Sequence, residues 1–511
     1  MLSTLVVVTP EFSTIFLFNL VCTLVVIAFC LFRFIKKDWA LARLSFVFAA
    51  FACLFYQIPL VLFSAQLKVS LHQPWNYALA VNGGVLTLAL WNVLTRHFDL
   101  HKNIPVVLQT SYGIYILTGV MGVGLLWIYF LRIPYYCTGL YALLFDPVLT
   151  SLARELSGKL IGTSWATLSL GAYANAIAPI FILFSIWLIR DSFLSSRPLH
   201  ALVGGLGGFF SIMALLITGT KGLLIPTIVM LTVGAYFGCK TWFSKIFTFS
   251  CFVAFLIFCL ASFEIFRGKK SETVGTYDFA ACSVEIGSCD KSHELLESLK
   301  ARELSLNIPM IFVDHLQSRL ACLCEGDGHA EICPTATLLL NMNDIDNRFI
   351  EMLKGISYRT FVAPFQVSAW HFMYSETESF DRLKTLPFSK KIFGDSISTP
   401  ELVYQKYASI YFRGNKTSTG SAPTSFFLAY SANLSWVGFF LALGCIIGLD
   451  IFLIRFAMFV DSSLIIPLIG LVVIISLKFI SSDFVTVLLS HGGIASIFTI
   501  YILTIFLRKK T

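Results

Sequence analysis

Long apolar runs separated by short polar connections make up most of the 511-residue chain. About eleven of these runs approach the ~20 residues that an α-helix needs to cross a bilayer. The pattern therefore predicts an all-α polytopic membrane protein with about eleven transmembrane helices. The expected spans are residues 12–35, 44–66, 75–95, 105–131, 168–189, 201–219, 222–238, 245–266, 434–456, 463–481 and 487–507.

Every second connection between the apolar runs is basic. Cytoplasmic connections are enriched in Lys and Arg, so these connections are predicted to lie in the cytoplasm. The N-terminus, the 132–167 loop, the 218–222 turn and a long polar segment before the last three spans are then predicted to face the outer side. The basic residues are Arg33, Lys36, Lys37, Arg43, Arg96, Lys102, Arg190, Arg197, Lys240, Lys245, Arg455, Arg508, Lys509 and Lys510.

The same pattern predicts three regions. Residues 1–266 hold the first eight transmembrane helices, with an outer amphipathic helix near 140–165, where leucines recur every four residues. Residues 267–426 form a long outer loop, with a Cys-rich insertion at 271–341 and a helical part at 342–385. Residues 427–511 hold the last three transmembrane helices.

The composition agrees with a membrane protein. The chain is 57% hydrophobic and only 13% charged, whereas soluble domains average about 25% charged residues. The net charge of +8 comes from basic clusters at the ends of apolar runs, where they act as topology signals. The lipid bilayer is therefore an expected partner, and nucleic acid is not.

Several cations lie on the predicted outer side, against the usual bias. Any one of them has a simple interpretation, because Lys and Arg near a helix end extend toward lipid phosphates. Several on one face also suit a substrate that carries phosphate or pyrophosphate. The main examples are Arg132, Arg154, Lys159, Lys221 between two glycines, and Arg267.

The first half of the long loop is rich in cysteine. Outside the cytosol such clustering favours disulfides, and Cys137 of another outer loop would make the number even. The run 322–333 also contains ligand types for zinc, although its spacing matches no common zinc module. Disulfides are the preferred interpretation, with connectivity left open. The loop cysteines are Cys282, Cys289, Cys322, Cys324 and Cys333.

The second half of the loop predicts two helices that break before Pro364. Its aromatic residues alternate with Arg348, Arg359 and His371. Sugars stack on aromatic faces while their hydroxyls and phosphates bind charged groups. The alternative is an interfacial helical hairpin with a structural histidine. Further on, Tyr430 and Asn433 mark the polar start of a span, and polar side chains at that depth usually face a cavity.

Four features together resemble the bacterial O-antigen polymerases, the Wzy-type oligosaccharide repeat-unit polymerases related to the O-antigen ligases. They are the 218–222 turn, the long late loop, the element around Arg359 and Pro364, and the stretch TGSAPTSFFLAYSANLSWVG. The resemblance covers topology over nearly the whole chain. The Cys-rich part of the loop departs from the family pattern.

The resemblance implies a metal- and cofactor-independent, GT-C-like glycosyltransferase of the bacterial inner membrane, with its active site facing the periplasm. Its substrates would be glycans carried on undecaprenyl pyrophosphate, and further partners would be a chain-length regulator and a flippase. His371 is the expected base, with Glu351 and Asp395 behind it, and Arg359 the expected catalytic cation. The expected substrate- and pyrophosphate-binding residues are Arg154, Lys221, Arg267, Arg348 and Tyr430.

Rival functions remain at this point. An O-antigen ligase would share the fold and donor but use a lipid A core acceptor, and the large loop favours a polymerase. Polyprenyl-phosphate-sugar transferases carry an acidic motif in the first outer loop, whereas residues 67–74 contain no carboxylate. A transporter is less favoured, because transporters commonly contain internal repeats and none is evident here.

Overall fold

The computed structural model describes residues 10–35, 42–62, 73–96, 112–131, 133, 138–139, 141, 165–216, 224–238, 362–377, 399–408 and 424–508. Within these ranges the regular structure is helical, and several α-helices continue through a single π-helical turn. The chain divides into two compact units, which are described separately. Unit 1 comprises Met1–Asn103, Leu353–Val460 and Val472–Val487, and unit 2 comprises Ile104–Met352, Asp461–Leu471 and Leu488–Thr511.

Eight helices in the described ranges are long and apolar enough to cross a bilayer. Two shorter apolar helices, α12 (Leu224–Gly238) and α25 (Gly493–Arg508), accompany them. Within the described ranges, the prediction of an all-α, multi-pass membrane protein is therefore confirmed. Each expected span coincides with one of these helices except 245–266, which lies outside the described residues, so the total of eleven stays a prediction. The eight are Thr14–Arg33, Leu44–Leu62, Pro74–Leu94, Tyr112–Phe130, Leu168–Phe193, Pro198–Leu215, Phe426–Phe459 and Ser462–Phe479.

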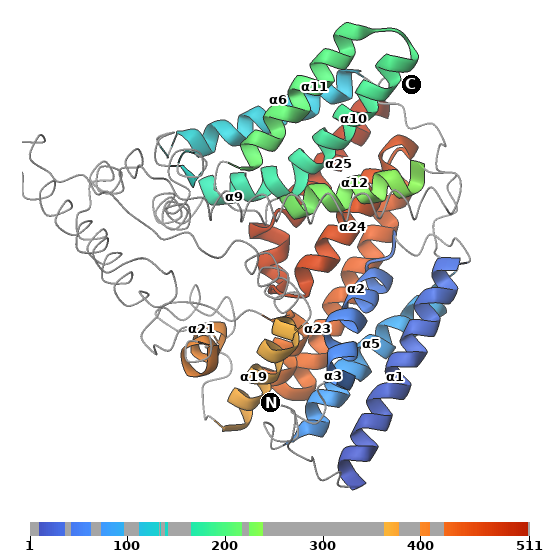
Figure 1. Ribbon diagram of the computed structural model, residues 1–511, viewed down its shortest axis with the longest axis vertical. Helices are drawn as coiled ribbons and strands as arrows, with labels where there is room; N and C mark the ends of the chain where they lie inside the picture. The colour runs from blue at the N-terminus through green and yellow to red at the C-terminus, as the bar shows by residue number, and fades with distance from the viewer. Residues whose placement is uncertain are drawn as a thin grey trace, which may run out of the picture. The chain divides into compact units, whose positions relative to one another are not determined.

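Unit 1 brings helices from the start of the chain against helices from its last third (Figure 1). Gly84 in one of them has no side chain, so the ring of Phe427 packs against its backbone, and a Cβ there would come within 2.5 Å of that ring. The helices are α1 (Pro10–Ile35), α2 (Leu44–Ala52), α3 (Ile58–Leu62), α5 (Pro74–Leu94), α19 (Ala363–Thr377), α21 (Thr399–Val403) and α23 (Phe426–Phe459).

Three buried amides link the early helices of unit 1. Gln57 donates from Nε2 to Oδ1 of Asn82 at 2.9 Å, and Asn82 donates from Nδ2 to Oδ1 of Asn19 at 2.7 Å. All three side chains are fully buried. Because unbonded amides are costly in an apolar interior, this chain of bonds fixes α1, α5 and the turn after α2 relative to each other.

The helix α23 contains a break at Ser435. That residue has φ 55° and ψ −139°, which is a strained conformation for any residue except glycine. The span expected at 434–456 corresponds to the part after the break, and the two turns that precede it begin at Phe426, earlier than expected. The expected span omitted these first turns, in which Phe426, Phe427 and Leu428 are buried.

The break brings the backbone carbonyl of Tyr430 against Gly438. A Cβ at Gly438 would collide with that carbonyl oxygen, which belongs to the backbone and cannot rotate away. We expect Gly438→Ala to lower the free energy of unfolding by about 1–3 kcal/mol, the usual cost of overpacking.

Gly444 on the same helix is a matched control for this substitution. A Cβ there would meet no atom within 4 Å, so Gly444→Ala should be neutral or stabilising by up to about 1 kcal/mol. Thermal unfolding of both purified variants in detergent checks the difference. Equal midpoints for Gly438→Ala and the wild type would contradict the observed break.

Unit 2 is built on α6 (Tyr112–Phe130), α9 (Trp165–Ala172), α10 (Ala178–Leu194) and α11 (Pro198–Leu215), together with α12 and α25. Polar contacts join neighbouring helices, as where Tyr173 Oη and Ser211 Oγ lie 2.8 Å apart. The helix α24 (Ile465–Phe479) begins in unit 2 and ends in unit 1. The expected amphipathic helix near 140–165 and the Cys-rich insertion at 271–341 lie outside the described residues, apart from Tyr141 and from Trp165, where α9 begins.

Candidate functional site

A cavity of about 310 Å³ lies at the end of unit 1 where α5 and α23 begin. Three helices contribute to its wall: the start of α5, the last turns of α19 and the two sides of the break in α23. Its lining combines a carboxylate, two amides and three hydroxyls with an indole and two phenyl rings. The lining residues are Gln73, Asn76, Ala80, Phe372, Ser375, Glu376, Ser431, Ala432, Ser435, Trp436 and Phe439.

The helix α19 reaches the cavity because it is fixed to α5 by Tyr77. It begins at Ala363, and Pro364 lies in its first turn, where proline is tolerated. The Tyr77 hydroxyl lies 2.5 Å from Ser368 Oγ, and the Tyr77 ring packs edge-on against Phe372 with centroids 5.0 Å apart. One turn further on, Ser375 and Glu376 reach the cavity wall.

The opposite face of α19 packs on a second helical segment. Val367, Trp370 and Tyr374 form a buried cluster with Val403 and Tyr404, which lie where α21 ends and a π-helical turn begins. The aromatic residues that suggested sugar binding from sequence are therefore divided. Some of them build the core that holds α19, and Phe372 faces the cavity.

The polar rim of the cavity is held by hydrogen bonds across two helices. The backbone N–H of Gln73 donates to Glu376 Oε1 at 3.3 Å, and the Asn76 amide donates to the Gln73 side chain. Trp436 lines the cavity and is 48% exposed. A carboxylate and amides beside an open indole are the groups that bind sugar hydroxyls and sugar ring faces.

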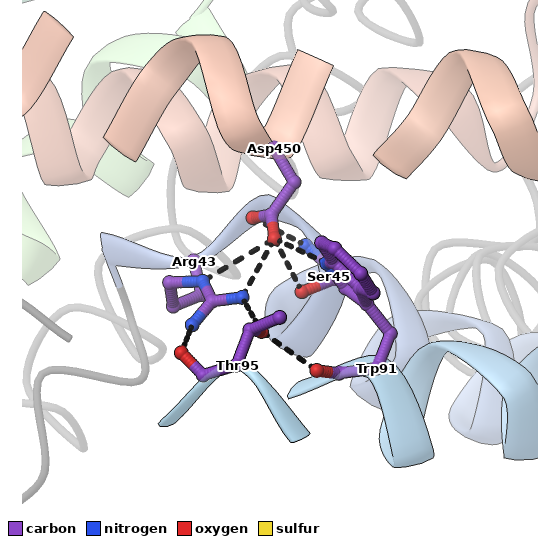
Figure 2. Close-up of polar contacts among 5 residues, drawn as sticks. All are labelled: Arg43, Ser45, Trp91, Thr95 and Asp450. Atoms are coloured by element: carbon purple, nitrogen blue, oxygen red, sulfur yellow. Dashed lines mark hydrogen bonds and ion pairs between the residues drawn. The ribbon is translucent and has the colours of Figure 1, made fainter. Parts of the chain in front are cut away.

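A buried ion pair lies near the other end of the same helices (Figure 2). Arg43, just before α2, pairs with Asp450 of α23 at 2.9 Å, and the two side chains are 1% and 0% exposed. Asp450 also accepts bonds from Ser45 and from the indole of Trp91, while Arg43 donates to Thr95 at the end of α5. Removal of either charged partner would leave the other charge buried without compensation. The pair therefore stabilises the bundle only while both residues are present.

The two ends of unit 1 fit the predicted topology. The start of α2, the end of α5 and the later part of α23 meet at the ion pair, and the alternation of basic connections predicts all three to be cytoplasmic. The starts of α5 and α23 meet at the cavity. The cavity therefore belongs to the end of the bundle that is predicted to face outward.

Two of the expected site residues fall within the described part of the chain. His371 is fully buried, one residue before Phe372 and one turn before Ser375, and it does not belong to the cavity wall. Tyr430 also lies away from the wall, and its hydroxyl donates to Asp483 Oδ1 at 3.3 Å. Their assigned roles stay predictions.

Asp483 lies between α24 and the next helical turn. Burial raises the pKa of its carboxyl above the usual value, and the backbone N–H groups of Thr486 and Val485 partly offset this rise. Asn433, also expected at a cavity, is buried and donates to Thr399 Oγ1 at 3.1 Å. Its neighbours Ala432 and Ser431 line the cavity instead.

The other expected site residues lie outside the described residues. The structure therefore neither brings these cations together nor separates them. The residues outside the described ranges are Arg154, Lys221, Arg267, Arg348, Glu351, Arg359 and Asp395.

Sequence reasoning missed Glu376, Gln73 and Asn76 as candidate site residues. Glu376 follows the aromatic part of α19 in the run Tyr374 to Thr377, where a carboxylate at a helix end is unremarkable. A helical projection of α19 does place Glu376 one turn after Phe372, on the face that lines the cavity. That periodicity is the signal that could have identified it.

Comparison with family models, with curated proteins and with solved structures found no match.

Proposed function

We propose that the protein is an integral-membrane, GT-C-like glycosyltransferase that polymerises undecaprenyl-pyrophosphate-linked repeat units on the periplasmic face of the bacterial inner membrane. The observation that carries this proposal is the cavity between α5, α19 and α23. Its groups suit sugar, it belongs to a multi-pass membrane bundle, and it lies at the bundle end predicted to face outward. A site for lipid-linked glycans needs all three properties.

The reaction requires one bond to form and one to break. A hydroxyl oxygen of the new repeat unit attacks the anomeric carbon of the growing chain, and the bond from that carbon to the pyrophosphate oxygen breaks. Undecaprenyl pyrophosphate leaves with the electron pair, and the hydroxyl proton passes to a base. The enzyme must therefore stabilise negative charge on the leaving group and hold a base near the acceptor.

His371 is the proposed base and Arg359 the proposed partner of the leaving pyrophosphate. His371 lies on the helix that forms one wall of the cavity, adjacent to Phe372. Arg359 precedes that helix by a few residues in the sequence. Arginine suits the role because its planar guanidinium binds phosphate oxygens in pairs. Arg154, Lys221, Arg267, Arg348 and Tyr430 are proposed to bind the remaining substrate groups.

Deletion of the gene tests the function, because polymerase and ligase leave different glycans on the cell surface. Without a polymerase, surface glycan should fall to single repeat units. Without a ligase, no repeat unit should reach the lipid A core. Electrophoresis of the surface glycan distinguishes these results, and an unchanged ladder of long chains would contradict both activities.

A further inference from the structure

We infer that Tyr430 and Asp483 form a second binding site in unit 1, which takes a hydroxyl group of the glycan. The inference rests on the proposed function for the identity of the ligand. It gives the Tyr430 hydroxyl a specific partner in the substrate, and it adds Asp483 as a binding residue. The site is separate from the cavity, because neither residue belongs to the cavity wall.

The pair lies at the end of unit 1 that is predicted to face outward. Asp483 falls between the last two expected spans, in a connection that the alternation of basic connections places on the outer side. Tyr430 belongs to the first segment of α23, one residue before Ser431 of the cavity wall. Both residues of the pair belong to unit 1, and both are half-buried.

The hydrogen bonds of the pair decide which groups it can bind. Tyr430 donates its hydroxyl proton to Asp483 Oδ1 at 3.3 Å. A phenol has a single proton and an ionised carboxylate has none, so any further hydrogen bond to either group must be one that it accepts. The pair therefore suits a ligand group that donates, such as a sugar hydroxyl. It offers no proton to a phosphate oxygen.

Capping of the next helical turn explains one half of the Asp483 carboxylate. Its Oδ2 accepts from the backbone N–H groups of Val485 at 3.1 Å and Thr486 at 3.4 Å. Such a cap needs a single oxygen, as Asp461 shows before α24, where Oδ1 accepts from the backbone N–H of Ser463 at 2.9 Å. Capping therefore does not account for Oδ1 of Asp483, the oxygen that the Tyr430 hydroxyl contacts.

Aromatic rings pack beside the pair. Phe426 packs edge-on against Tyr430 with centroids 5.9 Å apart, and Phe479 stacks on Phe484 at 5.5 Å. Phe426 and Phe479 are buried, whereas Phe484 is half-buried next to Asp483 in the sequence. An aromatic ring beside hydrogen-bonding groups offers apolar area to the C–H face of a sugar ring.

The proposed reaction joins two glycans, the growing chain and the new repeat unit, so it needs two places for sugar. The first segment of α23 contributes Ser431 to the cavity and Tyr430 to the pair. Two glycans bound at these places would meet the same short helical segment. This arrangement supports the assignment of the pair to one of the two glycans.

The test measures binding of the repeat-unit glycan of the host strain, released from its lipid by mild acid, by titration calorimetry. The purified full-length protein is held in phosphatidylcholine vesicles, whose headgroups have no N–H or O–H group to compete. We expect Asp483→Asn and Tyr430→Phe each to weaken binding by roughly tenfold, because each removes an acceptor for the hydroxyl. The double variant should lose little more than either single variant, because the two groups act as a unit.

Asp461→Asn is the matched control. Asp461 caps a short helical turn in the same way but belongs to unit 2, so this variant should bind the glycan like the wild type. Burial raises the pKa of the Asp483 carboxyl, and its protonation removes an acceptor. Wild-type affinity should therefore fall as the pH drops through that pKa, and Asp483→Asn should lack this dependence. A purely structural Asp483 would lower the unfolding midpoint and leave the affinity of folded protein unchanged.

Inorganic pyrophosphate is the second probe, and its binding should not depend on Tyr430. Glycan binding that Asp483→Asn and Tyr430→Phe both retain, or pyrophosphate binding that Tyr430→Phe removes, would overturn the inference alone. Absence of glycan binding by the wild type would also overturn it. The deletion phenotype then shows whether the proposed function fails as well, because it reports polymerisation without reference to this site.

Discussion

Replacement of Asp450 with alanine is expected to lower the free energy of unfolding by about 3–5 kcal/mol, the typical cost of breaking a buried ion pair. Arg43 is 1% exposed and would keep its charge in the interior without a counter-ion. The Ser45 hydroxyl and the Trp91 indole would lose their acceptor as well. The loss is measured from unfolding in detergent, by heat or by denaturant.

Two further variants separate the ion pair from other effects. The double replacement Arg43→Met with Asp450→Leu should be more stable than Asp450→Ala alone, because it leaves no unpaired charge. Asp191→Ala removes an ion pair of similar length, 2.8 Å between Asp191 and Arg190. In this pair the Asp191 side chain is 27% exposed and the Arg190 side chain 41%. Exposed pairs contribute at most about 1 kcal/mol, so this control should change little. Similar small losses for Asp450→Ala and Asp191→Ala would contradict a structural role for the buried pair.

Replacement of His371 with alanine is expected to lower polymer formation by roughly 100-fold or more, since a general base contributes about 10²–10⁴ to the rate. Binding of the lipid-linked donor should change little, because the proposed role of His371 is to act on the acceptor. The measurement is chain growth in membranes with matched expression of each variant. His371 is fully buried, so its role requires α19 to expose it when substrate binds.

Stability distinguishes this role from a purely structural one. A structural His371 would lower the unfolding midpoint and the expression together, whereas a base lowers turnover in folded protein. His200→Ala is the control, because His200 stacks on Tyr112 in unit 2 and should keep activity. Arg359→Lys should impair activity nearly as much as Arg359→Ala, because lysine lacks the paired geometry. Wild-type chain length from both His371→Ala and Arg359→Ala would refute the proposed catalytic pair.

Much of the fold was predictable from sequence because one physical requirement dominates it. A helix that crosses a bilayer must satisfy its backbone internally and expose apolar side chains, which produces long apolar runs. The observed helices therefore match the expected spans closely. The break at Ser435 was not predictable, because serine carries no local signal for φ 55°. At the break the backbone carbonyl of Tyr430 lies against Gly438, which has no side chain.

The site was harder to predict because its residues come together from segments that lie far apart in the sequence. Arg43 was assigned only as a topology signal, yet it pairs with Asp450 over a separation of 407 residues. No local pattern encodes a contact at that distance. The cavity joins α5, α19 and α23, so its wall depends on how distant segments pack. Aromatic composition drew attention to α19, which lines the cavity, but it did not separate core residues from those that face the cavity.

The most direct test of the central claim is polymer synthesis by the purified protein in lipid vesicles that contain only lipid-linked single repeat units. We expect a ladder of products that differ by one repeat unit, formed equally well with EDTA, because in the proposed mechanism cationic side chains take the place of a metal. No products longer than one repeat unit, or activity that EDTA abolishes and a divalent ion restores, would contradict a metal-independent polymerase.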